Sequence, residues 1–291
     1  MFRILIPVDF SEGSTKACHY ALQLAAGVPG AKLLLLHCFQ DYLADADVMP
    51  ASAAGLSPSE QIAERVLHRN EYEAQEQLEA LYQDLQRQVR SLGNNLHIDR
   101  AFIHGLPEEE ILEQIERFHP ALVVMSTKGE SSIGRAVFGT VSTKVIEDTN
   151  VPVLTVPNQY DGAKPSKVLY ATDFGKTDVA DIDRIRQLLQ HLQPMFYCVH
   201  ISDDPEEDRE KLLTLQQNLQ QGAAEHNIRY ALLEGSDVAE SLQDFARSEG
   251  IDLLALTTRE RNTLDSLFSP SLAKKMVLHA PLPVLVFHSR A

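Results

Sequence analysis

Tryptophan is absent from this chain of 291 residues, and cysteine is rare. The three cysteines, Cys18, Cys38 and Cys198, are scattered, form no CxxC pair and are odd in number, which argues against a disulfide framework. Few unpaired cysteines are typical of a reducing compartment, so we expect the cytoplasm. The apolar runs, such as 33–36, are strand-sized and fall well short of the ~20 residues that a membrane-spanning helix needs.

Positive charge is also scarce, with 26 Lys and Arg against 41 Asp and Glu and a net charge of -15. Phosphate backbones and anionic lipids are bound by clustered Lys and Arg, so we expect neither nucleic acid nor a membrane as a partner. The first residues read as a strand without a basic segment and cleavage site, so no signal peptide is expected. The remaining composition, 44% hydrophobic and 23% charged, is that of a globular protein with two ordinary domains.

The chain repeats itself. A period this long indicates duplicated domains, and Asp161, Gly162 and Pro165 interrupt the pattern between them. We therefore predict domains at 1–157 and 167–291, joined by a linker at 158–166. The repeated segments are ILIPVDFS (4–11) and VLYATDFG (168–175), LLLLH (33–37) and MFYCVH (195–200), and PVLTV (152–156) and PVLVF (283–287).

Each repeat alternates strands with helices, which predicts an α/β fold with a doubly wound, five-stranded parallel sheet. The segment 121–125 is apolar without alternation, as expected for a strand that is buried on both faces. Ligands of such sheets bind beyond the carboxyl ends of the strands, so we expect the site in the loops after the first and fourth strands. In the first half we predict strands near 2–8, 32–38, 96–103, 121–127 and 152–157, and helices near 12–27, 58–92, 108–118 and 140–149.

The segment after the fourth strand carries the spacing Ser126-x2-Gly129-x9-Gly139-Thr140. With the aspartate after the first strand (Asp9) and the closing PVLTV strand, it resembles the universal stress protein family, whose ATP-binding members carry G-x2-G-x9-G-[ST]. The resemblance covers both halves and departs from the motif at Ser126. It implies an adenine nucleotide alpha hydrolase-like fold with strand order 3-2-1-4-5, and a pseudo-twofold tandem in which the last strands of the two halves pair.

The glycines and hydroxyls of this segment suit a phosphate. Gly129 permits a positive φ and a close approach of the backbone, and Gly139 and Thr140 open a helix whose free N–H groups favour an anion. The hydroxyls of Thr140 and Ser142 can donate to phosphate oxygens, and Lys128 can add a positive charge. The spacing Gly129-x4-Gly134 superficially resembles a P-loop, but Arg135 and Ala136 follow where Lys and Ser or Thr are required, so it is not a Walker A motif.

The resemblance also implies a nucleotide-binding set in the first half. It makes ATP or ADP the ligand, with or without Mg²⁺, and gives Asp9 the ribose hydroxyls or the nucleotide-bound metal. The backbones of Val8 and Cys38 would meet the adenine. The expected nucleotide-binding residues are Pro7, Val8, Asp9, Cys38, Met125, Ser126, Lys128, Gly129, Gly139, Thr140, Val141 and Ser142.

Simpler interpretations stay open for several of these residues. Asp9 could instead cap the helix that starts near Gly13, and Thr140 could be only an N-cap. We expect His37 and His200 to be satisfied polar residues rather than ligands, and Cys38 to be a buried hydrophobe rather than a reactive thiol. The acidic stretch 203–208 is expected to be a solvated helix start rather than a metal site.

The second half departs from the motif at every glycine position. Thr257 and Glu260 stand at the first two positions, and Pro270 stands at the third. A carboxylate at Glu260 would repel phosphate, and Pro270 removes an N–H donor from the helix start. We therefore expect this half to be a structural or regulatory partner, although Asp173 is retained.

Three functions remain open. The first is a stress-response protein that binds ATP or ADP in its first half as a conformational or signalling ligand, with little or no hydrolysis. The second is a nucleotide-free dimerising or interaction protein with degenerate pockets in both halves. The third is a slow metal-dependent ATPase using Asp9. We assign no catalytic residue and no protein metal site, and expect an intramolecular pseudo-dimer that could also form a homodimer.

Overall fold

The computed structural model describes residues 1–40, 58–92, 96–127, 140–161, 164–220, 227–258 and 270–288. In the first half the elements are β1 (Arg3–Pro7), α1 (Glu12–Ala25), β2 (Lys32–Phe39), α2 (Pro58–Leu92), β3 (His97–His104), α3 (Pro107–Phe118), β4 (Leu122–Ser126), α4 (Thr140–Asp148) and β5 (Val153–Val156). In the second half they are β6 (Lys167–Ala171), α5 (Asp178–Leu189), β7 (Met195–Ser202), α6 (Pro205–Gln220), β8 (Ile228–Glu234), α7 (Val238–Glu249), β9 (Leu253–Thr258), α8 (Pro270–His279) and β10 (Val284–His288).

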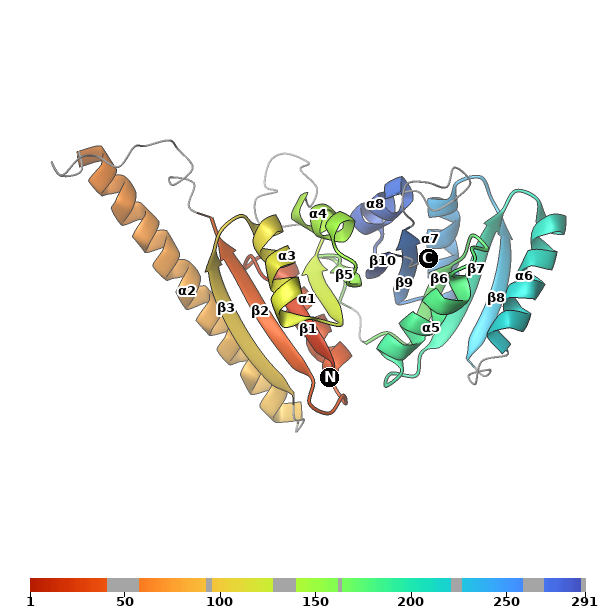
Figure 1. The fold of residues 1–291 in the computed structure, drawn as a ribbon, viewed down its shortest axis with the longest axis horizontal. Helices are drawn as coiled ribbons and strands as arrows, with labels where there is room; N and C mark the ends of the chain where they lie inside the picture. Colours follow the sequence, from red (N-terminus) through yellow and green to blue (C-terminus); the bar gives the residue numbers. More distant parts are fainter. Residues whose placement is uncertain are drawn as a thin grey trace.

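The ten strands form one sheet in the order β3-β2-β1-β4-β5-β10-β9-β6-β7-β8. Each half therefore has the predicted order 3-2-1-4-5, and the α/β fold with a mainly parallel sheet is confirmed. The halves meet at β5 and β10, which pair antiparallel with Leu154 opposite Leu285 (Figure 1). The predicted junction through the last strands is thus confirmed.

Helices cover both faces of this sheet, because its strands are apolar on both sides. On one face α1 and α2 contribute Leu24 and Leu85 to a core that continues into the second half, where α5 and α6 contribute Leu189 and Leu219. On the other face each half has its own core, under α3 and α4 or under α7 and α8. Ile146 of α4 packs against both of these cores. The two halves therefore share packing on both faces of the sheet.

The sheet brings the predicted site loops together. Ile4 of β1 pairs with Leu122 of β4 and with Leu33 of β2, so these three parallel strands end at the same edge. The chain crosses over in opposite directions from β1, which makes this edge the topological switch point. Within the described residues no helix is both long enough and apolar enough to cross a membrane.

Candidate functional site

The loop after β1 starts with Val8, whose two backbone groups already have partners. Its N–H donates to the carbonyl of Leu36 at 2.8 Å, which extends the pairing with β2 by one residue beyond Pro7. Its carbonyl lies 2.8 Å from Nδ1 of His37, and because a carbonyl can only accept, this nitrogen carries the proton. Val8 could therefore contact adenine through the second lone pair of its carbonyl oxygen, because its N–H already donates to Leu36.

Asp9 holds the start of α1 indirectly. Its Oδ1 accepts from the backbone N–H of Ser11 at 3.1 Å and from the hydroxyl of Ser11 at 2.6 Å. Ser11 is the N-cap, since its Oγ accepts from the backbone N–H of Ser14 at 3.1 Å. The alternative that Asp9 itself caps this helix is thus wrong: Asp9 fixes the residue that does. The arrangement places a carboxylate at the mouth of the switch point.

Phe10 separates these two residues and has a φ of 63°, a left-handed conformation that is uncommon for an aromatic residue. Its ring stacks on His37 with centroids 4.3 Å apart. Desolvation lowers the pKa of His37, while the hydrogen bond to Val8 and the charge of Asp9 oppose the shift. His37 is therefore a satisfied polar residue that ties the loop to β2, as expected.

The end of β4 lies against the start of α1. A Cβ at position 13 would lie 3.1 Å from Cβ of Ser126 and 2.2 Å from Oδ1 of Asn158, so a larger residue than glycine would require the side chain of Asn158 to move. Ser126 shares its side of the sheet with Val124, which packs under α1, whereas Met125 is buried in the core under α3 and α4. The Cβ of Ser126, the residue that departs from the family motif, thus lies next to α1.

The remaining first-half candidates fall into two groups. Val141 and Ser142 lie in the first turn of α4, which begins at Thr140, with Val141 half-buried and Ser142 buried. Lys128, Gly129 and Gly139 lie outside the described residues, so their predicted roles stay predictions. The structure therefore brings Pro7, Val8, Asp9, Met125 and Ser126 to one sheet edge.

Cys38 follows His37 on β2 and is half-buried beside α3. Desolvation raises the pKa of its thiol to about 12, and the carboxylates of Glu110 and Glu108 act in the same direction. A thiol with this pKa stays protonated at neutral pH and is a poor nucleophile. Cys38 can thus line a base-binding slot through its backbone, but it is no candidate for covalent chemistry.

The second half reproduces the geometry of the first loop. The carbonyl of Thr172 lies 2.7 Å from Nδ1 of His200, and Phe174, with a φ of 59°, packs on the same imidazole at 4.1 Å between centroids. Thr172, Phe174 and His200 correspond to Val8, Phe10 and His37. The repeated histidine is therefore a structural element of both halves.

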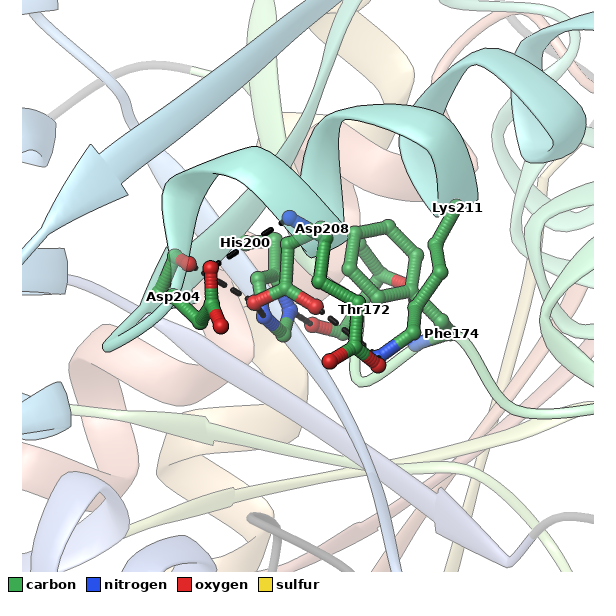
Figure 2. A network of polar contacts seen from close by, with 8 residues as sticks. Thr172, Phe174, His200, Asp204, Asp208 and Lys211 are labelled. Atoms are coloured by element: carbon green, nitrogen blue, oxygen red, sulfur yellow. Dashed lines mark hydrogen bonds and ion pairs between the residues drawn. The ribbon is translucent and has the colours of Figure 1, made fainter.

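On the other side of His200 lies the carboxylate of Asp208, which belongs to α6 (Figure 2). One carboxylate oxygen lies 3.1 Å from Nε2 of His200 and 2.7 Å from the hydroxyl of Ser202, and the other lies 3.1 Å from Nζ of Lys211. Burial alone would raise the pKa of Asp208, but the hydrogen bonds from Ser202 and Lys211 and the nearby charges lower it overall. The acidic stretch expected to be solvated thus contains one buried carboxylate.

A second buried carboxylate stands under the loop after β6. Asp178 is fully buried and accepts from the hydroxyl of Tyr170 at 3.1 Å, from the hydroxyl of Thr172 and from the backbone N–H of Gly175 at 3.0 Å. The corresponding residue of the first half is Ser14, a neutral side chain. The switch point of the second half therefore holds the carboxylate of Asp178 where the first half has Ser14, and the first-half residues at the place of Asp208 lie outside the described residues.

Sequence reasoning missed four residues that shape the first loop. Ser11, Gly13 and Phe10 act through a cap, a close contact and an unusual φ, and Asn158 approaches from the end of β5. The signal that was available is the repeated Asp-Phe pair, which precedes a histidine at the end of the second strand in both halves. The contact of Gly13 with Asn158 is tertiary and leaves no local pattern.

Comparison with known proteins agrees with this architecture. The model of the universal stress protein family matches residues 1–157 and 166–288. Universal stress protein MJ0531 of Methanocaldococcus jannaschii is 29% identical over 154 residues, covering 53% of this chain and 81% of its own length.

Solved structures are similar as well. A universal stress protein from Archaeoglobus fulgidus covers 99% of this chain and 98% of its own at 17% identity and a TM-score of 0.66. A family protein from Arabidopsis thaliana with AMP bound covers 54% and 92% at 17% identity, and its TM-score of 0.34 is too low to place a nucleotide here. From the two family-model matches, the chain belongs to the universal stress protein family and carries that domain twice.

Proposed function

We propose that the first half binds an adenine nucleotide, ATP or ADP with or without Mg²⁺, as a conformational or signalling ligand in a stress response. The observation that carries this proposal is the contrast between the two switch points. The first has a carboxylate, Asp9, at its mouth and a neutral Ser14 beneath it. At the second, the place of Ser14 is taken by the buried carboxylate of Asp178.

Electrostatics favours the first half for a polyphosphate. The N-termini of α1 and α4 lie beyond β1 and β4, and free N–H groups at helix starts attract anions. A buried carboxylate in the same position repels phosphate, because the low local dielectric screens the repulsion weakly. We therefore assign nucleotide binding to the first half and a regulatory or structural role to the second.

Asp9 fits a part in holding ribose or a nucleotide-bound Mg²⁺. Its Oδ1 accepts two hydrogen bonds from Ser11, which hold the carboxylate at the carboxyl end of β1. Mg²⁺ bound to a nucleotide prefers one or two carboxylates together with phosphate oxygens. The bound metal would neutralise phosphate charge, and Asp9 would orient it from the protein side.

Hydrolysis is not part of the proposal. Rapid phosphoryl transfer needs an oriented water and charge stabilisation at the leaving phosphate. We assign Asp9 to the ribose or the nucleotide-bound metal rather than to activating a water, and the protonated nitrogen of His37 donates to the carbonyl of Val8. We propose turnover far below the ~1 per second of typical enzymes.

The nucleotide content of the purified protein tests this proposal. Because tryptophan is absent, one bound adenine would raise the ratio of absorbance at 260 nm to that at 280 nm conspicuously. Titration calorimetry with ATP, ADP and AMP should then show one site per chain. The Gly129→Glu variant, which imports the carboxylate of Glu260 into the first half, should abolish this binding, and Glu260→Ala should leave it unchanged.

Two outcomes would favour the other functions. Absence of binding and of any thermal shift with all three nucleotides would favour a nucleotide-free interaction protein. Phosphate release near one per second with ATP and Mg²⁺, lost in Asp9→Ala, would instead make this chain an ATPase.

A further inference from the structure

Two histidines of the second half contact the two first-half helices that begin at the candidate site. His191, just beyond α5, places Nε2 at 2.6 Å from the carbonyl of Leu24 in the last turn of α1. His288, at the end of β10, places Nε2 at 2.7 Å from the carbonyl of Ile146 in the last turn of α4. In both cases a ring N–H donates to one of the carbonyls that a helix end leaves unpaired.

The second contact is part of a larger connection. The other ring nitrogen of His288 lies 2.8 Å from the hydroxyl of Thr258, the last residue of β9. Arg184 of α5 donates to the carbonyl of Asn150, two residues beyond α4, at 3.1 Å and to the carbonyl of His288 at 3.3 Å. The C-terminal end of α4 is thus contacted by β10 and α5 of the second half, and β9 holds His288 in place through Thr258.

Comparison of the two repeats shows that the first half has no histidine at the positions that match His191 and His288. His191 stands two residues beyond the end of α5, and the residue two positions beyond the end of α1 is Gly27. His288 is the fifth residue after the proline that leads its strand, and the residue in that position of the first half is Pro157. Neither Gly27 nor Pro157 has a side-chain donor. The second half can therefore hold the helices of the first through these positions, while the first cannot reciprocate.

A helix transmits this restraint to the site because it is stiff. α1 has 14 residues and α4 has 9 residues, which at about 1.5 Å per residue makes rods of roughly 21 and 13 Å. The direction of the free N–H groups at one end depends on where the other end is held. A binding site whose donors are held in place before binding pays less ordering entropy when the ligand arrives.

We propose that His191 and His288 are positioning residues through which the second half sets the nucleotide affinity of the first and responds to its occupancy. This inference rests on the proposed nucleotide site. Coupling of this kind is reciprocal, so a second half that tightens the site must itself be ordered when nucleotide binds. The retained second domain would then be a regulatory partner of the first.

Calorimetry on matched variants tests whether the second half sets the nucleotide affinity of the first. His191→Ala and His288→Ala should each weaken ATP binding by roughly threefold to tenfold, the ratio expected for losing one such hydrogen bond. His288→Gln should restore affinity to nearly the parent value, because the amide can donate to Ile146 and accept from Thr258. Tyr160→Phe removes a different contact with the second half, the 3.3 Å hydrogen bond to the carbonyl of Asp252, and should bind as the parent does.

Hydrogen exchange on the parent tests the reciprocal effect without any variant. ATP should slow amide exchange in the second half around β9 and β10, as well as in α1 and α4. If exchange slows in the first half alone, or if both alanine variants fold and bind ATP like the parent, the inference is overturned while the nucleotide site stands. A parent that binds no adenine nucleotide overturns both.

Discussion

Phe10 stacks on His37 with ring centroids 4.3 Å apart while its own backbone stands at a φ of 63°. A left-handed backbone costs roughly 1–2 kcal/mol for a residue with a Cβ, and an aromatic pair contributes about 0.5–1.5 kcal/mol. These two terms nearly cancel. The ring also packs, half-buried, against the core under α1 and α2, so Phe10 both fixes the shape of the loop and adds to stability.

Phe10→Gly should accordingly weaken nucleotide binding and also lower stability, because the half-buried ring no longer packs against the core. Glycine adopts the positive φ without strain, but without the ring the loop that carries Asp9 is no longer tied to β2. We expect the ATP dissociation constant to rise about tenfold and the free energy of unfolding to fall by about 1–3 kcal/mol. Phe174→Gly makes the same change in the second half and should leave affinity intact. Equal losses of affinity in the two variants would show that the loop is not specific to the site.

Much of the fold could be predicted from the sequence because its signals are local. The first-half strands and helices begin and end within about two residues of the predicted bounds, since 121–125 is apolar throughout and helix α3 carries its apolar residues on one face. The pairing of β5 with β10 followed from the repeat and the family resemblance, not from any pattern within either strand.

The candidate site could be predicted only in outline. That Asp9 would lie at the switch point follows from strand order, but that it holds Ser11 depends on the turn made by Phe10. Asp208 contacts His200 because α6 starts directly after β7, and no sequence motif predicts this contact. Contacts such as these arise from tertiary packing, which periodicity and spacing do not encode.

The contact between Gly13 and Asn158 gives a second prediction. A Cβ at position 13 would lie 2.2 Å from Oδ1 of Asn158, so Gly13→Ala should lower stability by about 1–3 kcal/mol through overpacking. Asn158→Ala alone should be neutral or slightly stabilising, because its Oδ1 is buried without a hydrogen-bond partner in the described structure. The double variant should recover most of the loss in a urea melt. Additive effects of the two changes would contradict the contact.

The thiols give a third prediction. Burial raises the pKa of Cys18 and of Cys38 to about 12, and it raises that of Cys198 as well. Because the thiolate is the reactive form, none of the three should react appreciably with a disulfide reagent at pH 8 in the folded protein. All three should react promptly in guanidinium chloride, which serves as the control. Fast labelling of Cys38 in the folded protein would mean that the first loop opens.

His37 gives a fourth prediction, on the dependence of stability on pH. Burial lowers its pKa below the ordinary value of 6.5, so the unfolded chain takes up a proton at a higher pH than the folded one. The stability that the neutral ring contributes is therefore complete above about pH 6.5 and is lost as pH falls through the lower folded pKa. Melting temperatures should fall between about pH 7 and 5, and His37→Gln should flatten this slope. Identical slopes in parent and variant would contradict the assignment.

Asp208, in the second half, gives a prediction for stability at lower pH. Hydrogen bonds from Ser202 and Lys211 keep its pKa below the ordinary 3.8 despite its burial. Its contribution is therefore present above about pH 4 and is lost as pH falls through the lower folded value. Asp208→Asn should destabilise the protein at pH 7, because the hydroxyl of Ser202 and the ammonium of Lys211, which donate to the two carboxylate oxygens, would meet an amide with one acceptor oxygen.

The expected loss for Asp208→Asn is about 2–3 kcal/mol, or roughly 5–10 °C in melting temperature. Lys211→Gln is the matched control: its side chain is largely exposed, so it should shift the melting temperature much less. Because Asp208 belongs to the half that we propose does not bind nucleotide, and contacts neither His191 nor His288, the variant should keep the parent's ATP affinity in calorimetry. A loss of affinity equal to that of Phe10→Gly would instead place the nucleotide in the second half and reverse the assignment of the two domains.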